Sequence, residues 1–242
     1  MTPSPAAVIA HRGASADAPE HTIAAFELAL DQGADGLAVE VHLSADQHPV
    51  VLRDFTVERT TDGAGVVADL RVRDLKRLDA GGWRGREFAG QRIQTLEEVL
   101  ERFRERTRFW LELKGGHAVY PDLEERVIST IEIYDVVDRV VVQSFDRTTL
   151  ETVRRRQPDL QLGLLMAQAP LDGTALDPGG PEAIVPAAEV CSEDLVKRIR
   201  DAGRECYVWM VHEPALADRL VGWGVNGIIT DRPGAVRARL GR

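Results

Sequence analysis

The sequence predicts an α/β protein, a single (β/α)8 TIM barrel with a small insertion after the second or third strand. Short apolar runs that end in charged residues or glycine alternate with helical patterns along all 242 residues. This alternation is typical of parallel βαβ units, and so many units in one chain favour a closed barrel over an open sheet. Because no low-complexity linker divides the chain, we expect one domain over residues 1–242.

Composition excludes several classes of protein. The net charge is −9 and no long basic run is present, so nucleic acid is not an expected partner. Two cysteines are too few for a disulfide framework. Residues 1–5 lack the features of a signal peptide, and no apolar run could span a bilayer. We expect a cytoplasmic protein without a membrane anchor, and the oligomeric state is left open.

The first predicted strand delivers two reactive side chains. Val8-Ile9-Ala10 suits a buried strand, and it is followed directly by His11, Arg12 and Gly13. Histidine exchanges a proton near neutral pH, and the arginine fork matches phosphate geometry. These residues indicate work on a phosphate ester. The alternative is that His11 only caps a core strand and that Arg12 is a surface charge.

The second predicted strand alternates strictly from Leu37 to Leu43, with Glu40 and His42 on the face opposite its leucines and valines. In a barrel that face points inward, whereas at a sheet edge it would be solvated. The next apolar run, residues 49–54, places Arg53 at its end. Residues 55–94 lose strand character, and we interpret them as an inserted flap.

The rest of the chain continues the alternation. Thr95 to Glu98 reads as a capping box at the start of a helix, and residues 108–114 form a strand that carries Glu112 and Lys114 before a glycine turn. Further strands are expected at 140–145, 162–166, 183–190, 206–211 and 227–231, with residues 167–180 as a loop. These are nine strand candidates for eight places, so one of residues 49–53 or 183–190 is expected to be accessory. The carboxyl ends of barrel strands form the active face, which is where the charged residues fall.

Several ordered motifs together carry a resemblance to a known family. They are Ala10-His11-Arg12-Gly13, Pro19-Glu20-His21-Thr22, the strand around Glu40, Pro49-Val50-Val51 with Asp54, Arg59-Thr60-Thr61-Asp62-Gly63, Leu111-Glu112-Leu113-Lys114, Gln143-Ser144-Phe145, Val208-Trp209 and Gly227-Ile228-Ile229-Thr230-Asp231-Arg232-Pro233. In this order they resemble the glycerophosphodiester phosphodiesterase family over nearly the whole chain.

The resemblance implies a barrel enzyme that uses a divalent cation, magnesium or calcium, to split a glycerophosphodiester into glycerol 3-phosphate and an alcohol. It assigns His11 as a catalytic histidine and Glu40 and Glu112 as metal ligands. It also implies substrate contacts from the side chains of Arg12, Lys114 and Trp209, and Arg53 is a further candidate for substrate binding because it ends an apolar strand. Trp209 has an equally good alternative interpretation as a core residue of its strand.

Four positions depart from the family pattern. The family's second strand usually reads Glu-x-Asp, where this chain has Ala38 and Glu40. The second catalytic histidine is replaced by Arg53, which cannot act as a general acid or base at physiological pH. His21 stands where the family usually has asparagine. The metal site is therefore weakened, and whether a cation binds at all is left open.

Three hypotheses follow from these departures. The first is hydrolysis of a soluble glycerophosphodiester, with His11 as the one histidine of the usual pair, helped by His21 or His42. The second is a catalytically impaired pseudoenzyme that binds a phosphorylated small molecule or a protein partner. The third is a shifted chemistry on a phosphate ester, in which an arginine-rich, metal-poor site stabilises a cyclic phosphate or a different leaving group.

Overall fold

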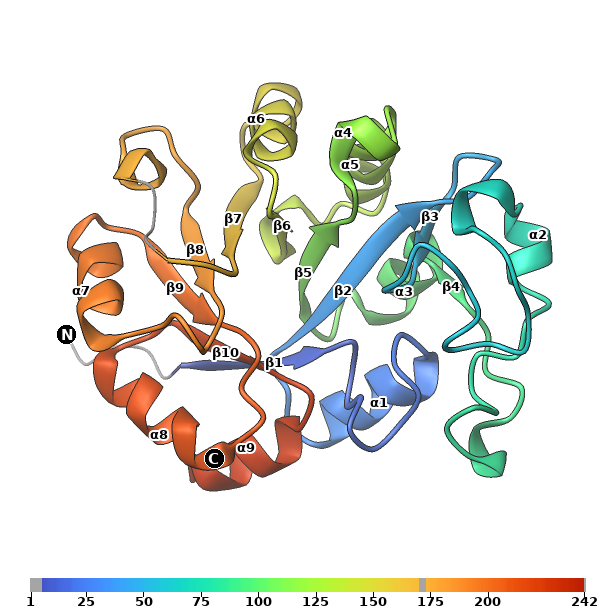
Figure 1. Cartoon of the computed structure of the whole chain (residues 1–242), viewed down its shortest axis with the longest axis horizontal. Coiled ribbons are helices and arrows are strands. Elements are labelled where there is room, and N and C mark those ends of the chain that lie inside the picture. The colour runs from blue at the N-terminus through green and yellow to red at the C-terminus, as the bar shows by residue number, and fades with distance from the viewer. Residues whose placement is uncertain (1–5, 170–172, 242) are drawn as a thin grey trace.

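A closed ring of parallel strands forms the centre of the molecule, and helices lie outside it (Figure 1). The computed structural model describes residues 6–169 and 173–241. Within them the ring closes because β1 pairs in parallel with both β2 and β10. The predicted (β/α)8 barrel is thereby confirmed. Its eight strands are β1 (Ala7–His11), β2 (Gly36–Leu43), β5 (Arg108–Leu113), β6 (Val140–Ser144), β7 (Gln161–Met166), β8 (Ala183–Pro186), β9 (Glu205–Val208) and β10 (Gly227–Thr230).

Two helices of the outer layer begin at threonine caps. Thr22 caps the first of them through the backbone N–H of Ala25, and Thr95 forms the predicted capping box with Glu98. The longer helices are α1 (Ile23–Asp31), α3 (Leu96–Phe103), α5 (Leu123–Ile133), α6 (Arg147–Arg156), α7 (Glu193–Asp201), α8 (Pro214–Trp223) and α9 (Pro233–Arg239). The short ones are α2 (Val72–Leu75), α4 (Gly116–Val119), η1 (Val67–Asp69), η2 (Arg86–Phe88), η3 (Val137–Arg139) and η4 (Gly173–Leu176).

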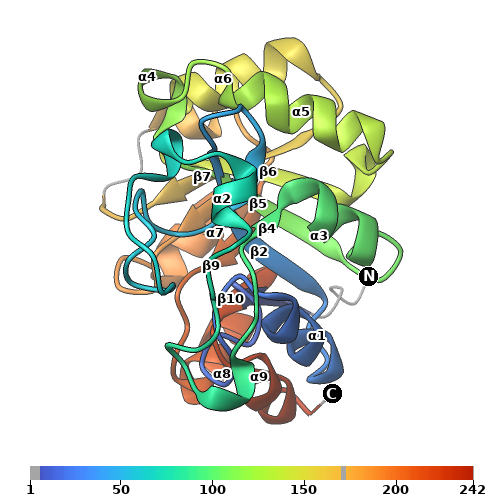
Figure 2. The same cartoon turned by 90° about the vertical axis from the view of Figure 1, so that its right-hand side faces the viewer.

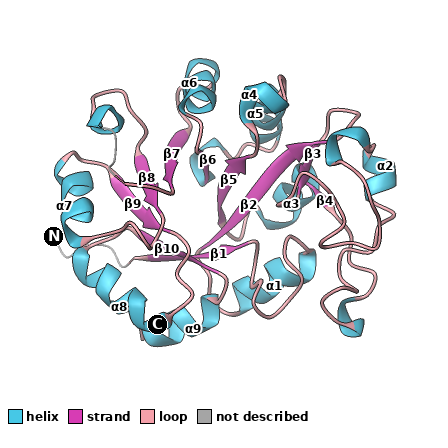
Figure 3. Cartoon of the chain, viewed as in Figure 1, coloured by secondary structure: helices cyan, strands magenta, loops and turns pink. Residues whose placement is uncertain are grey.

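Two further strands extend the sheet beyond the ring: β3 (Pro49–Val51) pairs antiparallel with the end of β2, and β4 (Gln94–Thr95) pairs antiparallel with β3. The accessory strand among the nine candidates is therefore the one at 49–53, while 183–190 contributes β8. Between β3 and β4 the chain is mostly loop (Figure 3). Figure 2, in which this segment faces the viewer, shows α2 and its loops outside the ring. The predicted insertion thus follows the second barrel strand.

The alternation in β2 separates two apolar layers. Leu37, Val39 and Val41 belong to the large core between strands and helices, whereas Ala38 packs inside the ring with Trp110. A Cβ on Gly36 would lie 2.3 Å from the Trp110 ring, so this glycine leaves room for the indole. Side chains fill the ring interior in this way, and hollow space remains at the carboxyl ends of the strands.

Two predictions fall partly or wholly outside the described residues. The prediction against a signal peptide concerns residues 1–5, which are not described. The loop predicted at 167–180 includes residues 170–172, which are not described either. Within the described chain, every helix is too short or too polar to cross a lipid bilayer.

Candidate active site

A pocket of about 510 Å³ opens at the carboxyl ends of the barrel strands. The structure brings together in its lining all the residues predicted for the site, namely His11, Arg12, Glu40, Arg53, Glu112, Lys114 and Trp209. Sequence reasoning gave no site role to the other lining residues, which are Gln143, Phe145, Leu165, Met210 and Ile229. A second hollow of about 350 Å³ lies between α6 and residues 174–181 and contains none of the predicted residues. The chemistry therefore belongs to the barrel pocket.

A sharp turn after β1 brings His11 and Arg12 into the pocket. A Cβ on Gly13 would lie 2.6 Å from the backbone of Ala25, and the φ of Gly13 is +84°, so both packing and conformation require glycine. Burial and then the charge of Arg12 lower the pKa of His11 to about 3. The imidazole is therefore neutral at physiological pH.

Glu40 is the anionic centre of the site. Its carboxylate lies 2.6 Å from Arg12 Nε, and its Oε2 accepts a hydrogen bond of 3.1 Å from His21 Nε2. An ionised carboxylate only accepts, so Nε2 of His21 carries the proton. Burial alone would raise the pKa of Glu40, but the hydrogen bond from His21 and the charge of Arg12 hold it well below its usual range. Glu40 therefore stays ionised.

Glu112 and Lys114 approach Glu40 from the neighbouring strand. Glu40 and Glu112 are direct partners in the parallel pairing of β2 with β5. Lys114 Nζ lies 3.0 Å from Glu112 Oε1 and 3.4 Å from Glu40 Oε1, so the ammonium bridges the two carboxylates. Burial and the charge of Glu40 raise the pKa of Glu112, because two adjacent buried carboxylates resist ionising together.

Arg53 reaches the pocket from the segment after β3, and His42 holds its backbone. Nε2 of His42 lies 3.2 Å from the carbonyl oxygen of Arg53, and Nδ1 lies 3.0 Å from the hydroxyl of Tyr120. The tautomer that satisfies both contacts donates from Nε2 to the carbonyl and accepts the hydroxyl proton at Nδ1. His42 is fully buried and outside the pocket lining, which favours a positioning role over direct compensation for a missing ligand.

Sequence reasoning missed an ion-pair chain behind Arg12. Glu20 accepts from Arg12 Nη1 at 3.2 Å and from both terminal nitrogens of Arg59, at 2.9 and 2.7 Å. Arg59 Nε also lies 2.5 Å from Asp54 Oδ2. Glu20 and Arg59 each belong to a motif that carried the family resemblance, and this membership is the sequence feature that could have identified them as site residues. This series of ion pairs connects the turn after β1 to the inserted segment.

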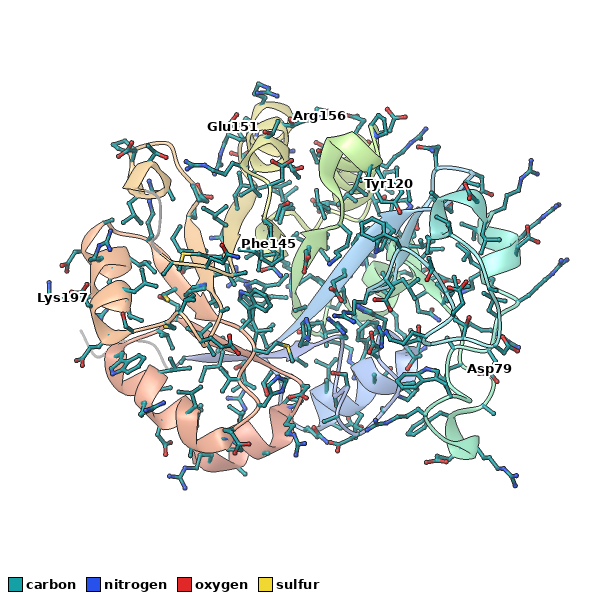
Figure 4. All side chains as sticks on the ribbon, in the orientation of Figure 1. Asp79, Tyr120, Phe145, Glu151, Arg156 and Lys197 are labelled. Atoms are coloured by element: carbon teal, nitrogen blue, oxygen red, sulfur yellow. The ribbon has the colours of Figure 1, made fainter. Side chains whose placement is uncertain are left out.

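The opposite side of the pocket is apolar and aromatic. Trp209 donates its indole N–H to the carbonyl of Val185 at 2.8 Å, which fixes the ring orientation. Phe145 meets Trp209 edge to face, with ring centroids 5.6 Å apart. Figure 4 shows Phe145 near the middle of the ring of strands and Tyr120 farther out, beside α4. Phe145 is 47% exposed, so its ring is open to a ligand.

The carboxylates of this pocket do not fit a three-carboxylate site for calcium or magnesium. Ala38, two residues before Glu40 on the same face of β2, is 2% exposed and offers no ligand atom. Glu40 and Glu112 already accept hydrogen bonds from the ammonium of Lys114. No group of three or more His, Cys, Asp or Glu side chains in the described residues could hold a metal ion. The implied cation site is therefore incomplete.

Comparisons with known proteins cover nearly the whole chain. Residues 11–235 match the model of the glycerophosphoryl diester phosphodiesterase family. A glycerophosphodiester phosphodiesterase from Caldanaerobacter subterraneus subsp. tengcongensis is 39% identical, over 93% of this chain and 94% of its own length. The structure of a phosphodiesterase from Oleispira antarctica in complex with the product sn-glycerol-3-phosphate superposes with a TM-score of 0.92 at 27% identity, covering 98% of each chain. A putative glycerophosphoryl diester phosphodiesterase from Silicibacter pomeroyi gives 0.88 at 27% identity, covering 98% of this chain and 94% of that one.

Proposed function

Because the chain belongs to the glycerophosphoryl diester phosphodiesterase family, we propose that it hydrolyses a soluble glycerophosphodiester to glycerol 3-phosphate and an alcohol. One observation carries the proposal: a neutral histidine, His11, shares a pocket with the cations of Arg12, Arg53 and Lys114. That combination provides a proton acceptor beside an anion site. The product complex of the relative from Oleispira antarctica supports the class of ligand.

In the proposed reaction the cationic side chains bind the phosphodiester and stabilise the charge that builds on its oxygens. Lys114 and Arg53 offer donors to the non-bridging oxygens, and Arg12 is held in place by Glu40 and Glu20. Fixed donors of this kind stabilise the transition state more than the ground state. Removing one such donor typically costs on the order of 10² to 10³ in rate.

His11 is the proposed proton-transfer group. Water attacks phosphorus and His11 accepts its proton, while the P–O bond to the alcohol breaks and the departing oxygen takes up a proton from solvent water. His11 then returns its own proton to solvent. Arg53 cannot protonate the departing oxygen, because arginine stays protonated at physiological pH. The expected rate is therefore below that of a site with two titratable groups, since one general acid or base contributes roughly 10²- to 10⁴-fold. No step is assigned to a metal ion, because the donor set does not fit one.

A second function deserves a test because of Ala38 and Arg53. Both replace groups that the family chemistry uses, and neither weakens binding of an anion. On this alternative the pocket binds a phosphorylated small molecule or a partner without turnover. A cytoplasmic location belongs to the proposal in either case, since the acidic, cysteine-poor composition supports it.

The test is release of glycerol 3-phosphate from glycerophosphocholine and glycerophosphoethanolamine, with and without calcium, magnesium or manganese. The wild type is compared with His11→Ala and with the double variant Ala38→Glu plus Arg53→His. Turnover by the wild type that disappears in His11→Ala supports the proposed hydrolysis. No turnover by the wild type together with turnover by the double variant establishes the binding protein instead.

A further inference from the structure

The position between Glu40 and Glu112 is filled by a side chain of the protein. The two carboxylates are partners across neighbouring strands, with side chains 5% and 11% exposed, so both are withdrawn from bulk water. The ammonium of Lys114 lies within 3.4 Å of one and 3.0 Å of the other. Buried carboxylates need a compensating cation, and here Lys114 supplies it.

Among the described residues, no third carboxylate, histidine or thiol joins Glu40 and Glu112 in a group that could hold a metal ion. Ala38 contributes a methyl group inside the barrel. Gln143, the partner of Glu112 on the other side, lines the pocket and offers one neutral amide oxygen, which is buried and has no hydrogen-bond partner. Glu20 is occupied by Arg12 and Arg59. A hard cation that prefers six or more oxygens would find two carboxylates, both already paired, and one amide oxygen.

The charges that line the pocket are weighted towards cations. Arg12, Arg53 and Lys114 carry three positive charges, and Glu40 and Glu112 carry at most two negative charges. This surplus of positive charge favours an anionic phosphate without the help of a divalent cation.

Two of the cations keep donors for a ligand. Lys114 has three N–H donors, and its recorded contacts in the described chain, Glu40 and Glu112, use two of them. The side chain of Arg53 is 47% exposed, and its recorded ion pair there, with Asp54, is long at 3.4 Å. Both side chains line the pocket together with His11.

We propose that the pocket binds the phosphate group of its ligand directly through Lys114 and Arg53, with Arg12 behind them, and needs no divalent cation to do so. This inference rests on the proposed function in taking the same pocket as the phosphate site, but it concerns binding and not turnover. The ligand class is a small organic phosphate with glycerol 3-phosphate as its simplest member.

The test is calorimetric titration of the full chain with glycerol 3-phosphate, in buffer with EDTA and in buffer with calcium, magnesium or manganese. We expect the same Kd in all of them. A Kd that weakens tenfold or more in EDTA overturns the inference, since that factor is the signature of a bridging cation. Absence of binding in every buffer overturns it as well.

Variants distinguish phosphate binding by side-chain cations from phosphate binding by a bound metal ion. Arg53→Gln, at a half-exposed position, is expected to weaken binding about tenfold in EDTA with an unchanged melting temperature. Lys114→Met is expected to weaken it further. Arg73→Gln, which removes a 69% exposed arginine on α2, is the matched control and leaves the Kd unchanged. An Arg53→Gln variant with wild-type affinity contradicts the inference.

Turnover measured on the same samples keeps the two proposals apart. Metal-free binding without release of glycerol 3-phosphate from a diester supports the inference and overturns the proposed function. Metal-dependent binding with turnover overturns the inference and supports the proposed function. The double variant Ala38→Glu plus Arg53→His is expected to acquire a Kd that depends on the divalent cation, because it regains a carboxylate and loses a fixed charge.

Discussion

The two sides of the pocket are built on different principles. The charged wall comes from the first half of the chain and consists of His11, Arg12, Glu40, Arg53, Glu112 and Lys114. The apolar wall comes from the second half and consists of Phe145, Leu165, Trp209, Met210 and Ile229. On the proposed function, the charged wall binds the phosphate and the apolar wall faces the remainder of the ligand.

The two walls also differ in how their residues depend on one another. Glu40 alone contacts Arg12, His21 and Lys114, so the charged wall is a connected network in which one loss leaves several groups unpaired. In the apolar wall, Phe145 and Trp209 meet through ring contacts. Substitutions in the charged wall should therefore have large, coupled effects, and those in the apolar wall small, local ones.

The largest effect is expected from His11→Ala in the charged wall. Loss of the only proposed proton acceptor should lower kcat by roughly 10²- to 10⁴-fold, with little change in the binding of glycerol 3-phosphate. Steady-state release of glycerol 3-phosphate and calorimetry on the same preparation measure the two quantities. Activity retained in His11→Ala would show that the reacting proton goes elsewhere, and the charged wall would then be a binding surface only.

Glu40→Gln tests the connection within the charged wall through stability. The substitution keeps an acceptor but leaves the partly buried cations of Arg12 and Lys114 without their shared anionic partner. We expect a loss of about 3 to 5 kcal/mol in the free energy of unfolding, a fall in Tm on the order of 10 °C. Glu125→Gln is the control, because Glu125 also pairs with an arginine but is 55% exposed. Equal shifts in both variants would mean that the network adds nothing beyond surface pairing.

The fold could be predicted from the sequence because its signals are local and repeated. The strict alternation of Leu37 to Leu43 and the capping box at Thr95 each identified an element, and the structure contains both. The pattern could not decide which of two short apolar runs lies outside the ring. That choice is made by pairing: β3 runs antiparallel to β2, and β8 lies between β7 and β9.

The residues of the site could be predicted because they lie at the carboxyl ends of predicted strands. The seven predicted side chains line one pocket, yet their pairings could not be read from the sequence. The bridge from Lys114 to both glutamates depends on the register of β2 with β5. The contact of Arg59 with Glu20 joins residues 39 positions apart, with α1, β2 and β3 between them. Such contacts are tertiary, and motif membership was their one sequence signal.

Glu20→Gln probes the ion-pair chain behind the charged wall through pH. Burial would raise the pKa of Glu20, but hydrogen bonds from Arg59 and the charge of Arg12 outweigh it and lower the pKa to about 2 from 4.5. Because its pKa is lowered in the folded state, the ionised Glu20 stabilises the fold above pH 4.5, and this contribution is lost as the pH falls toward about 2. We expect the variant to lose on the order of 2 kcal/mol at neutral pH, an amount discounted because Arg59 is partly exposed.

Urea unfolding of wild type and Glu20→Gln at neutral pH and at successively lower pH measures this loss. The difference between the two proteins should shrink below pH 4.5. Glu105→Gln, at an 81% exposed position, should show no such dependence. A difference that stays constant with pH would contradict the role of Glu20 and leave Arg12 anchored by Glu40 alone.

The smallest effect is expected from Phe145→Ala in the apolar wall. If this wall faces the alcohol, the aromatic pair with Trp209 should contact the quaternary ammonium of glycerophosphocholine, at about 0.5 to 1.5 kcal/mol. KM for that diester should rise about threefold to tenfold, while the Kd of glycerol 3-phosphate, which lacks the alcohol, stays the same. Ile133→Ala, at a 77% exposed position on α5, is the control and should change neither value. A weaker Kd for glycerol 3-phosphate in Phe145→Ala would place the glycerol against the apolar wall, and the alcohol would then have to lie toward Arg53.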